Sequence, residues 1–478
     1  MNKYKSLALN TVVFTIGSFG SKFISIFLNN LYTKHIDPAS LFTKSLLETL
    51  ALFLIPIFTF SLKEALIRYG LDKDYDKKEV FSTAALLETG GLGIMLLLLP
   101  LLPDIPYFGR LGSYTVLLGI YILTSSLRAH CSQFVRACEK VGLFSLDGIL
   151  TTLMLFLFNL VFIGHLGMGV RGFMLSTILS DFCSAVFLFL TGKLHRYFSP
   201  KAWQPDLAKQ MLRFTVPLIP TTVMWTFTGI SDQLFIGGMK SEKVFLGESA
   251  AGIYAAAAKI PNLISMLSTI FFQAWNMSAI TENDSEDRNV FYEKVYSTYE
   301  AFLFIGSAGL LLLVKPVSAI FINYSVFPEY ATAYLNSPLL IAAAVFTCLD
   351  LFLASIYTAT KHTSNAFYTI LIVFLANILL NLCLIPLLGI QGAALATLLS
   401  YMICFWVRIF DARRYVPFRF YFATHLLNTG LLLLLCGLSI FQPPHFILME
   451  IPVCCGILLL NRRPFTALVG KVLKRERK

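Results

Sequence analysis

Residues 172–180 read Gly-Phe-Met-Leu-Ser-Thr-Ile-Leu-Ser, and residues 392–400 read Gly-Ala-Ala-Leu-Ala-Thr-Leu-Leu-Ser. Five of these nine positions are identical. Upstream of the two stretches, Phe158-Asn159-Leu160 is echoed by Leu380-Asn381-Leu382. Chance similarity between apolar helices is the alternative explanation. We interpret the match as an internal repeat of two consecutive helices.

The repeated pieces lie in a chain that is apolar almost throughout. Of its 478 residues, 56% are hydrophobic and only 14% are charged, with a mean hydropathy of +0.72. A soluble chain carries about a quarter charged residues. The apolar runs are long and rarely alternate with period two, so membrane-spanning helices of ~20 residues are favoured over a β-barrel.

The fold class predicted is an all-α polytopic membrane protein with about fourteen transmembrane helices. The expected spans are residues 8–33, 40–62, 80–102, 113–134, 143–165, 170–191, 212–238, 250–275, 294–314, 334–358, 364–387, 390–410, 420–441 and 446–461. The repeat pairs the fifth and sixth spans with the eleventh and twelfth. An even separation makes the two copies parallel. We therefore expect an N-terminal six-helix lobe over residues 1–205, a C-terminal six-helix lobe over 206–415, and two additional helices with a basic tail over 416–478.

The distribution of basic residues predicts the orientation. If the N-terminus is cytoplasmic, the inside segments carry 28 Lys and Arg and the outside segments carry 7. The remaining three, Lys22, Arg128 and Lys259, lie within spans. Both termini are therefore expected in the cytoplasm. The asymmetry accounts for the formal charge of +11 without nucleic acid as a partner. The acidic loop at residues 282–293 is the weakest point of this assignment.

Several kinds of site are excluded by what the sequence lacks. The nine cysteines have neither zinc nor disulfide-framework spacing and are interpreted as apolar filler. The chain contains no Gly-rich phosphate loop, no His-Glu-x-x-His and no Gly-x-Ser-x-Gly. We expect no metal site, no cofactor beyond a coupling Na⁺ or H⁺, and no catalytic residues, so the protein is not expected to be an enzyme.

Basic side chains inside spans are the first candidates for substrate contact. A charge in mid-membrane costs roughly 2.5–3.5 kcal/mol, so it normally faces a cavity or a partner. Lys22 and Lys259 are the deepest of these residues, and an ion pair is the alternative role for both. Arg128 is nearer the cytoplasmic end of its span. Arg68 lies four residues after Glu64, and it either forms an i,i+4 pair or lines a cytoplasmic entrance.

Acidic side chains inside spans are the candidates for coupling and gating. The acidic set is Glu48, Glu88, Asp147, Asp181, Asp232 and Asp350, and of these Glu48, Asp181, Asp232 and Asp350 are the coupling and gating candidates. Asp232 and Asp181 lie nearest the centres of their spans. Either carboxylate would hold a coupling ion or neutralise a buried cation.

A family resemblance adds to this interpretation. The residues that carry it are Asn10-Thr11, Phe14, Ile16-Gly17-Ser18-Phe19-Gly20-Ser21-Lys22, Leu31-Tyr32-Thr33, Pro56, Glu64-Ala65, Arg68-Tyr69, Pro217-Leu-Ile-Pro220, Trp225, Ser231-Asp232, Gly252-Ile-Tyr254, Ala258-Lys259-Ile-Pro261 and Gln273-Ala-Trp275. Over about residues 5–410 the chain resembles bacterial Wzx-type oligosaccharide flippases, a branch of the multidrug/oligosaccharidyl-lipid/polysaccharide exporter superfamily. Two positions depart from the family pattern. Gln233 stands where an Arg often follows the aspartate, and the first loop, Asp37-Pro-Ala-Ser-Leu, lacks the usual acidic-Tyr-Gly turn.

The resemblance implies two six-helix lobes in a V around a central cavity. It implies alternating-access translocation of an undecaprenyl-diphosphate-linked oligosaccharide across the bacterial cytoplasmic membrane, for surface polysaccharide biosynthesis. The implied partners are the lipid-linked oligosaccharide, membrane lipids and other polysaccharide-assembly proteins. Lys22 and Lys259 would bind the diphosphate, with Arg68 and Arg128 as further substrate contacts.

Two other functions stay open on the sequence. A cation-coupled multidrug antiporter of the same fold would favour an acidic cavity, whereas the two deepest charges here are lysines. A membrane glycosyltransferase or polymerase would need a large outside loop with clustered acidic or His residues. The longest outside connection, about residues 315–333, is short and contains no such cluster.

Overall fold

The computed structural model describes residues 24, 27–105, 108–281, 287–360 and 362–462. These residues form helices joined by short turns, and no strand occurs among them, which confirms the predicted all-α fold. The chain divides into two compact units, Met1–Ile230 and Ser231–Lys478.

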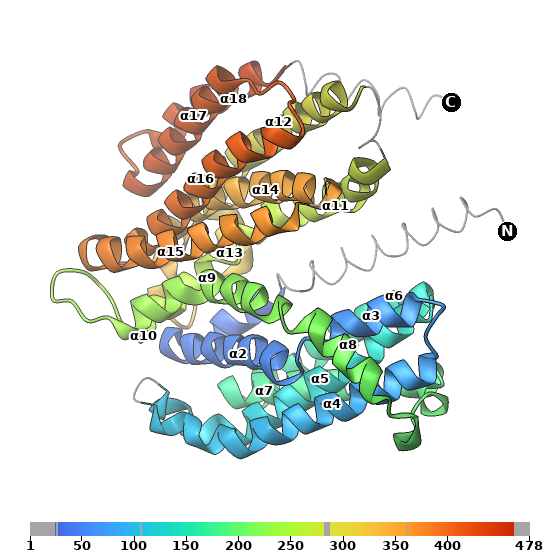
Figure 1. Ribbon diagram of the computed structural model, residues 1–478. Helices are drawn as coiled ribbons and strands as arrows, with labels where there is room; N and C mark the ends of the chain where they lie inside the picture. The colour runs from blue at the N-terminus through green and yellow to red at the C-terminus, as the bar shows by residue number, and fades with distance from the viewer. Residues whose placement is uncertain (1–23, 25–26, 106–107, 282–286, 361, 463–478) are drawn as a thin grey trace, which may run out of the picture. The chain divides into compact units, whose positions relative to one another are not determined.

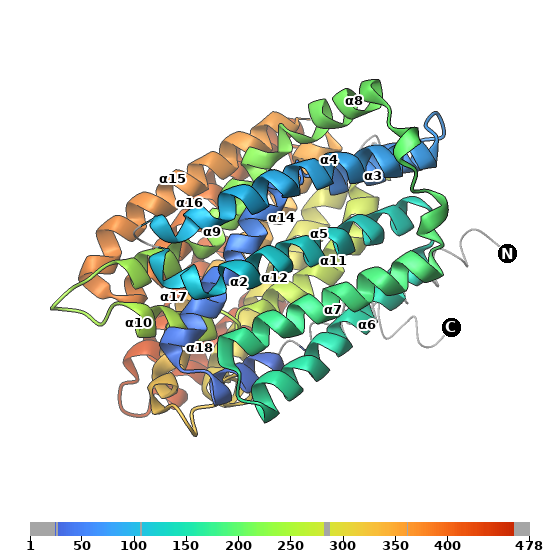
Figure 2. The same ribbon diagram turned by 90° about the horizontal axis from the view of Figure 1, so that it is seen from below.

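In the first unit, helices follow one another along the sequence with short connections between them (Figures 1 and 2). Its α-helices are α2 (Pro38–Phe58), α3 (Leu62–Leu71), α4 (Lys77–Leu98), α5 (Thr115–Ala137), α6 (Val141–Asn159), α7 (Gly169–Thr191), α8 (Pro205–Thr215) and the beginning of α9 (Leu218–Gly238). A π-helical turn, Leu160–His165, follows α6. Short 3₁₀ turns occupy Leu99–Asp104, Gly109–Tyr114, Leu194–Arg196 and Pro200–Ala202.

Local chemistry sets where these helices start. Asp37 precedes α2 and accepts a hydrogen bond from the backbone N–H of Ser40 at 3.0 Å, with Pro38 in the first helical position. Asp76 caps α4 in the same way through the Lys78 N–H at 3.0 Å. The residues that depart from the flippase pattern at 37–41 therefore act as a helix N-cap.

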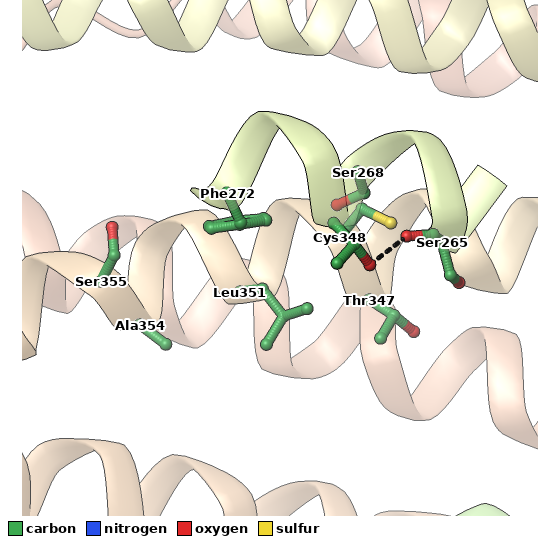
Figure 3. Close-up of a pocket in the computed structure, with 9 residues that line it drawn as sticks. Ser265, Ser268, Phe272, Thr347, Cys348, Leu351, Ala354 and Ser355 are labelled. Carbon is green, nitrogen blue, oxygen red and sulfur yellow. Dashed lines mark hydrogen bonds between the residues drawn. The ribbon is translucent and has the colours of Figure 1, made fainter. Parts of the chain in front are cut away.

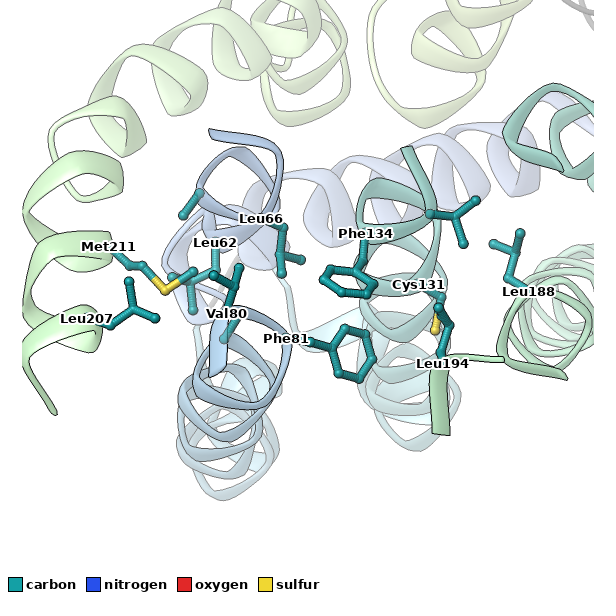
Figure 4. Packing of buried hydrophobic residues seen from close by; sticks show 13 residues of the cluster. Leu62, Leu66, Val80, Phe81, Cys131, Phe134, Leu188, Leu194, Leu207 and Met211 are labelled. Atoms are coloured by element: carbon teal, nitrogen blue, oxygen red, sulfur yellow. The ribbon is translucent and has the colours of Figure 1, made fainter. Parts of the chain in front are cut away.

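A hydrophobic core joins α3, α4, α5, α7 and α8 in the first unit (Figure 4). Leu66 of α3, Phe81 of α4 and Phe134 of α5 are at its centre, and Leu207 and Met211 of α8 close one side. The α8 helix thus packs within the first unit. The lobe boundary at residue 205 stays a sequence prediction.

The second unit contains α10 (Glu248–Ala257), α11 (Asn262–Thr281), α12 (Arg288–Leu312), α13 (Val314–Phe321), a 3₁₀ segment (Pro328–Asn336), α14 (Ser337–Ala359), α15 (Thr363–Leu388), α16 (Ile390–Tyr415), α17 (Phe422–Phe441) and α18 (Phe446–Leu460). The α14 helix is central in this unit. It packs against α11, α12, α16 and α17. In its most apolar stretch, 72% of the residues are buried. The last two helices pair with each other and lie against α12 (Figure 1).

Nine helices of the described residues are long and apolar enough to cross a membrane. Each corresponds to one predicted span. Of the other five spans, 8–33 lies mostly outside the described residues, and the helices over 113–134, 212–238, 250–275 and 446–461 do not meet the same length and hydropathy limits. The number fourteen is therefore not confirmed.

Two of the predicted spans each contain two helices, with a break at a proline. The span 212–238 is broken between Thr215 and Leu218, at Pro217, and the span 250–275 is broken between Ala257 and Asn262, at Pro261. Proline has no N–H to donate and its ring clashes with the preceding turn. At the second break, the N–H groups of Lys259 and Ile260 bond to carbonyls three residues earlier, at 3.3 and 3.2 Å.

The apolar surface fits a bilayer environment. Large apolar side chains such as Leu97, Val116, Leu387 and Phe441 are 71–84% exposed. In the most apolar stretches of α4, α6 and α15, less than a third of the residues are buried. Helices that are apolar on their exposed faces are stable in lipid and not in water. The protein is therefore an integral membrane protein.

All nine cysteines lie in the described part of the chain, and none forms a disulfide. Five are buried, Cys138 and Cys183 are half-buried, and Cys383 and Cys455 are exposed. Burial of the majority agrees with their interpretation as apolar filler.

Candidate functional site

A pocket of about 420 Å³ opens between α11 and α14 in the second unit (Figure 3). Five of the nine side chains that line it carry a hydroxyl group. The lining residues are Ser265, Ser268, Thr269, Phe272, Thr347, Cys348, Leu351, Ala354 and Ser355. Their spacing of three or four residues on each helix turns these side chains to one face. Pockets of this volume accommodate small ligands or single groups of larger ones.

Aromatic side chains pack between the helices next to the pocket. Trp275 of α11 donates its indole N–H to the Ser355 hydroxyl at 2.7 Å and stacks on Phe352 of α14, with ring centroids 4.6 Å apart. Phe271 stacks on Tyr299 of α12 at 4.1 Å. Stacked and edge-on rings fix one helix against another. The rings therefore hold α11, α12 and α14 together around the pocket.

A second polar site in this unit surrounds Asp232 of α9, which is buried. Thr397 of α16 donates to this carboxylate at 2.5 Å, Asn381 of α15 at 2.8 Å and Asn377 at 3.4 Å. The Tyr254 hydroxyl of α10 donates to it as well. Four donors from three helices thus stabilise a buried anion, and a lysine pairing of the kind proposed from sequence does not occur among the described residues.

This cluster also retains an acceptor with no donor. The Oδ1 atom of Asn381 is buried and has no hydrogen-bond partner among the described residues. The Nδ2 of the same amide donates to Asp232, and the Asp232 carboxylate with the Thr397 hydroxyl makes a buried, singly negative oxygen site. Such oxygen ligands suit a hard cation or a proton.

A charged cluster joins α5, α6 and α7 in the first unit. The Arg128 guanidinium lies 3.4 Å from the Asp181 carboxylate and 3.8 Å from that of Asp147. Its Nε donates to the Ser184 hydroxyl at 3.1 Å, and Ser184 donates to Asp147 at 2.5 Å. The Ser125 hydroxyl donates to Asp181. The Arg128 side chain is 32% exposed, whereas both carboxylates are buried.

The fourth acidic candidate, Asp350 of α14, is also buried. Its backbone carbonyl accepts from Arg408 of α16 at 2.9 Å, and the Arg408 Nε donates to Thr369 of α15 at 3.0 Å. Neither carboxylate oxygen of Asp350 has a hydrogen-bond partner among the described residues. Arg408 is itself buried.

Each unit also holds a buried histidine–glutamate pair. His130 of α5 contacts Glu88 of α4 at 2.7 Å, and His425 of α17 contacts Glu300 of α12 at 2.6 Å. The Nε2 atom of each ring has no partner among the described residues. Sequence analysis proposed neither pair, because the partners lie 42 residues apart in the first and 125 residues apart in the second.

The structure places the remaining predicted residues apart from these clusters. Lys22 lies outside the described residues. Arg68 is exposed on α3, as is Glu64. Glu48 pairs with Lys44 one turn earlier on α2 at 2.7 Å, and Lys44 also lies over the rings of Tyr32 and Phe173.

Lys259 occupies the turn that separates α10 from α11. Its side chain is half-buried, and within the described part of the chain no carboxylate lies in salt-bridge range of it. The pocket begins six residues later, at Ser265. The structural ion pair considered as the alternative role is thus not formed with a described residue.

Comparison with known protein families identifies the chain. Residues 45–323 match the family model described as "Polysaccharide biosynthesis protein". The chain belongs to the polysaccharide biosynthesis protein family. Residues 244–452 also match the model described as "Lipid II flippase MurJ". A curated relative, the membrane protein YabM of Bacillus subtilis (strain 168), is 26% identical over 223 residues, which cover 44% of this chain and 39% of that protein.

Solved structures give the fold of this member of the polysaccharide biosynthesis protein family. The lipid II flippase MurJ in an inward closed conformation matches with a TM-score of 0.68 at 17% identity, over 96% of this chain and 99% of that chain. An inward-facing multidrug resistance transporter of the MATE family, in the MOP superfamily, matches with a TM-score of 0.64 at 14% identity, over 82% of this chain and 95% of that chain. The predicted superfamily fold is confirmed.

Proposed function

We propose that the protein is a flippase that moves an undecaprenyl-diphosphate-linked oligosaccharide from the inner to the outer leaflet of the bacterial cytoplasmic membrane. The observation that carries this proposal is the pocket between α11 and α14, which is uncharged and lined by both hydroxyl groups and apolar side chains. A neutral, hydroxyl-rich head group fits such a lining. An organic drug cation would find no carboxylate among the lining residues. Membership of the polysaccharide biosynthesis protein family supports the same substrate class.

In this proposal Lys259 and Lys22 contact the diphosphate. Lys259 is half-buried at a helix break and has no carboxylate partner among the described residues, so its charge is available to an anion. A lysine in a poorly hydrated setting binds phosphate as a point charge. The role of Lys22 rests on the sequence alone, because this residue lies outside the described part of the structure.

Asp232 is the proposed coupling site. Its carboxylate is already stabilised by four donors, and the buried Oδ1 of Asn381 beside it lacks a partner among the described residues. A Na⁺ ion or a proton would neutralise the charge and complete that acceptor's environment. The excess of Lys and Arg in the segments on one side supports cytoplasmic N- and C-termini.

Transport of a lipid-linked oligosaccharide by the purified protein in reconstituted vesicles tests the function. Lys259→Gln should reduce export at least tenfold with normal insertion, because removing a buried charge does not impair insertion. Lys243→Gln, an exposed lysine in the loop between α9 and α10, is the matched control and should transport normally. Asp232→Asn should slow turnover more than it weakens binding. Export of an organic cation but not of the lipid would contradict the proposal.

A further inference from the structure

The hydroxyl groups of the pocket have their hydrogen atoms already engaged. Thr269 donates to the Ser265 carbonyl at 2.8 Å, Thr347 to the Ala343 carbonyl at 2.9 Å, and Ser355 to the Phe352 carbonyl at 2.6 Å. All three acceptors belong to the helix that carries the donor. A hydroxyl has one hydrogen and two lone pairs, so these groups keep only acceptor capacity for a ligand.

Ser268 lies against Tyr299 of α12. The two hydroxyl oxygens are 2.5 Å apart, and either hydroxyl can be the donor between them. Thr347 and Ser355, whose hydrogens are bonded within α14, are therefore the lining hydroxyls that present lone pairs to a ligand.

The hydrogen-bond polarity of the pocket selects among ligands. A phosphate or carboxylate has acceptors only, so it would face lone pairs without a donor or a cation in the lining. An ammonium group can donate, but the lining has no carboxylate to offset its desolvation. A neutral group rich in O–H or N–H donors avoids both costs, because it donates to the lone pairs of the lining and brings no charge. Sugar hydroxyls and the amides of N-acetylated sugars are such groups.

The remaining lining residues complete a carbohydrate-like environment. Phe272, Leu351 and Ala354 are apolar and share the pocket with the hydroxyls. In Figure 3, Phe272 of α11 and Leu351 of α14 lie between the hydroxyl groups at the two ends. A sugar ring has C–H faces as well as hydroxyl edges, and this mixture of surfaces matches both. The volume of about 420 Å³ admits a single sugar ring.

We propose that this pocket binds one neutral saccharide unit of the lipid-linked oligosaccharide by accepting hydrogen bonds from it, apart from the diphosphate. The inference rests on the proposed function and specifies its sugar site. In this proposal the protein recognises the neutral sugar directly, in addition to the diphosphate. The diphosphate binds elsewhere, at the lysines.

Binding of two lipids to the full chain in nanodiscs tests this. The probes are undecaprenyl diphosphate and undecaprenyl diphosphate linked to N-acetylglucosamine. Thr347→Val removes one acceptor at nearly constant volume and should weaken binding of the sugar-bearing lipid about 3- to 10-fold, the worth of one hydrogen bond. Binding of the sugar-free lipid should not change. Thr177→Val in α7 is the control, because Thr177 also donates to its own helix at 3.1 Å but does not line the pocket.

Filling the pocket gives an independent test. Ala354→Leu should remove the preference for the sugar-bearing lipid and leave the affinity for undecaprenyl diphosphate intact. Equal loss for both lipids, or no loss in either variant while the unmodified protein prefers the sugar-bearing lipid, would overturn the sugar site and leave the flippase function standing. If the unmodified protein binds neither lipid, the proposed function itself fails. Circular dichroism and thermal unfolding of both variants separate lost binding from lost folding.

Discussion

The three-helix group α5–α6–α7 of the first unit and the group α14–α15–α16 of the second contain the repeated sequence. In each group the third helix packs against both others. Gly172 and Gly392 stand near the start of that third helix and allow it to approach the end of the second. A Cβ atom at Gly172 would lie 3.1 Å from the Phe162 carbonyl oxygen, and one at Gly392 would lie 2.3 Å from that of Leu384.

The charges of the two groups are exchanged. In the first unit the arginine is on the first helix, as Arg128, and the acids Asp147 and Asp181 are on the second and third. In the second unit the acid Asp350 is on the first helix and Arg408 is on the third. The repeat therefore preserves small residues where backbones meet, while the placement of charge is free to change as long as a buried acid keeps a cation nearby.

The largest effect should come from removing the fully buried arginine. Arg408→Met deletes two hydrogen bonds from a buried guanidinium and removes a positive charge close to Asp350, so we expect a loss of about 3–5 kcal/mol in the free energy of unfolding. Arg128→Met should cost about 1–2 kcal/mol, because that side chain is 32% exposed and water replaces part of the interaction. Denaturant titration in mixed micelles measures both.

A double variant checks the cause. Combining Arg408→Met with Asp350→Leu removes the uncompensated charge and should recover at least half of the lost stability. If Arg408→Met and Arg128→Met lower the free energy of unfolding equally, the exposure of the arginine does not determine its contribution to stability.

The two glycines give the next effect. Gly392→Ala should destabilise by about 2–3 kcal/mol, because its new methyl group meets backbone atoms of α15 that cannot move aside. Gly172→Ala should cost about 1 kcal/mol or less, since its contacts begin at 3.0 Å and include the end of the Ile163 side chain. Thermal unfolding of the two variants in one detergent compares them. A larger loss at Gly172 would reverse our ranking of the two approaches.

The smallest effect concerns the repeated serines. The Ser180 hydroxyl donates to the Thr151 carbonyl of α6 at 2.8 Å, whereas Ser400 donates to Ala396 of its own helix at 2.6 Å. Ser180→Ala should cost about 0.6 kcal/mol, the average for an interhelical bond in a membrane protein. Ser400→Ala should be close to neutral, because its bond joins no second helix. If Ser400→Ala costs more than Ser180→Ala, the difference between the serines is not interhelical bonding.

Sequence analysis predicted the fold class because apolar runs and short polar connections determine it directly. The repeat also pointed to the correct helices, since glycine and serine at fixed positions reflect close packing. The sequence left open whether Pro217 and Pro261 kink their helices or end them, and the structure shows a break at each. A proline in an apolar run is compatible with a kinked or a broken helix, and packing against neighbours decides between them.

The site was less predictable for a physical reason. Asp232 was singled out as a buried charge, but its donors Asn377, Asn381 and Thr397 lie at least 145 residues away and are ordinary polar residues in apolar helices. Asn381 alone left a signal, through its place in the repeat. The pocket hydroxyls left none, because serines and threonines at helical spacing also occur where helices simply pack closely.

The burial of the cysteines determines how motion in this protein can be measured. Only Cys383 and Cys455 are exposed, so Cys383→Ser and Cys455→Ser together leave thiols that are buried or half-buried. Spin labels attached through Lys73→Cys in the first unit and Lys243→Cys in the second would then react far faster than that background, since both positions are exposed. Pulsed electron paramagnetic resonance with this pair measures a distribution of distances with and without lipid, and a shift between the two would reveal the alternating access proposed for this protein.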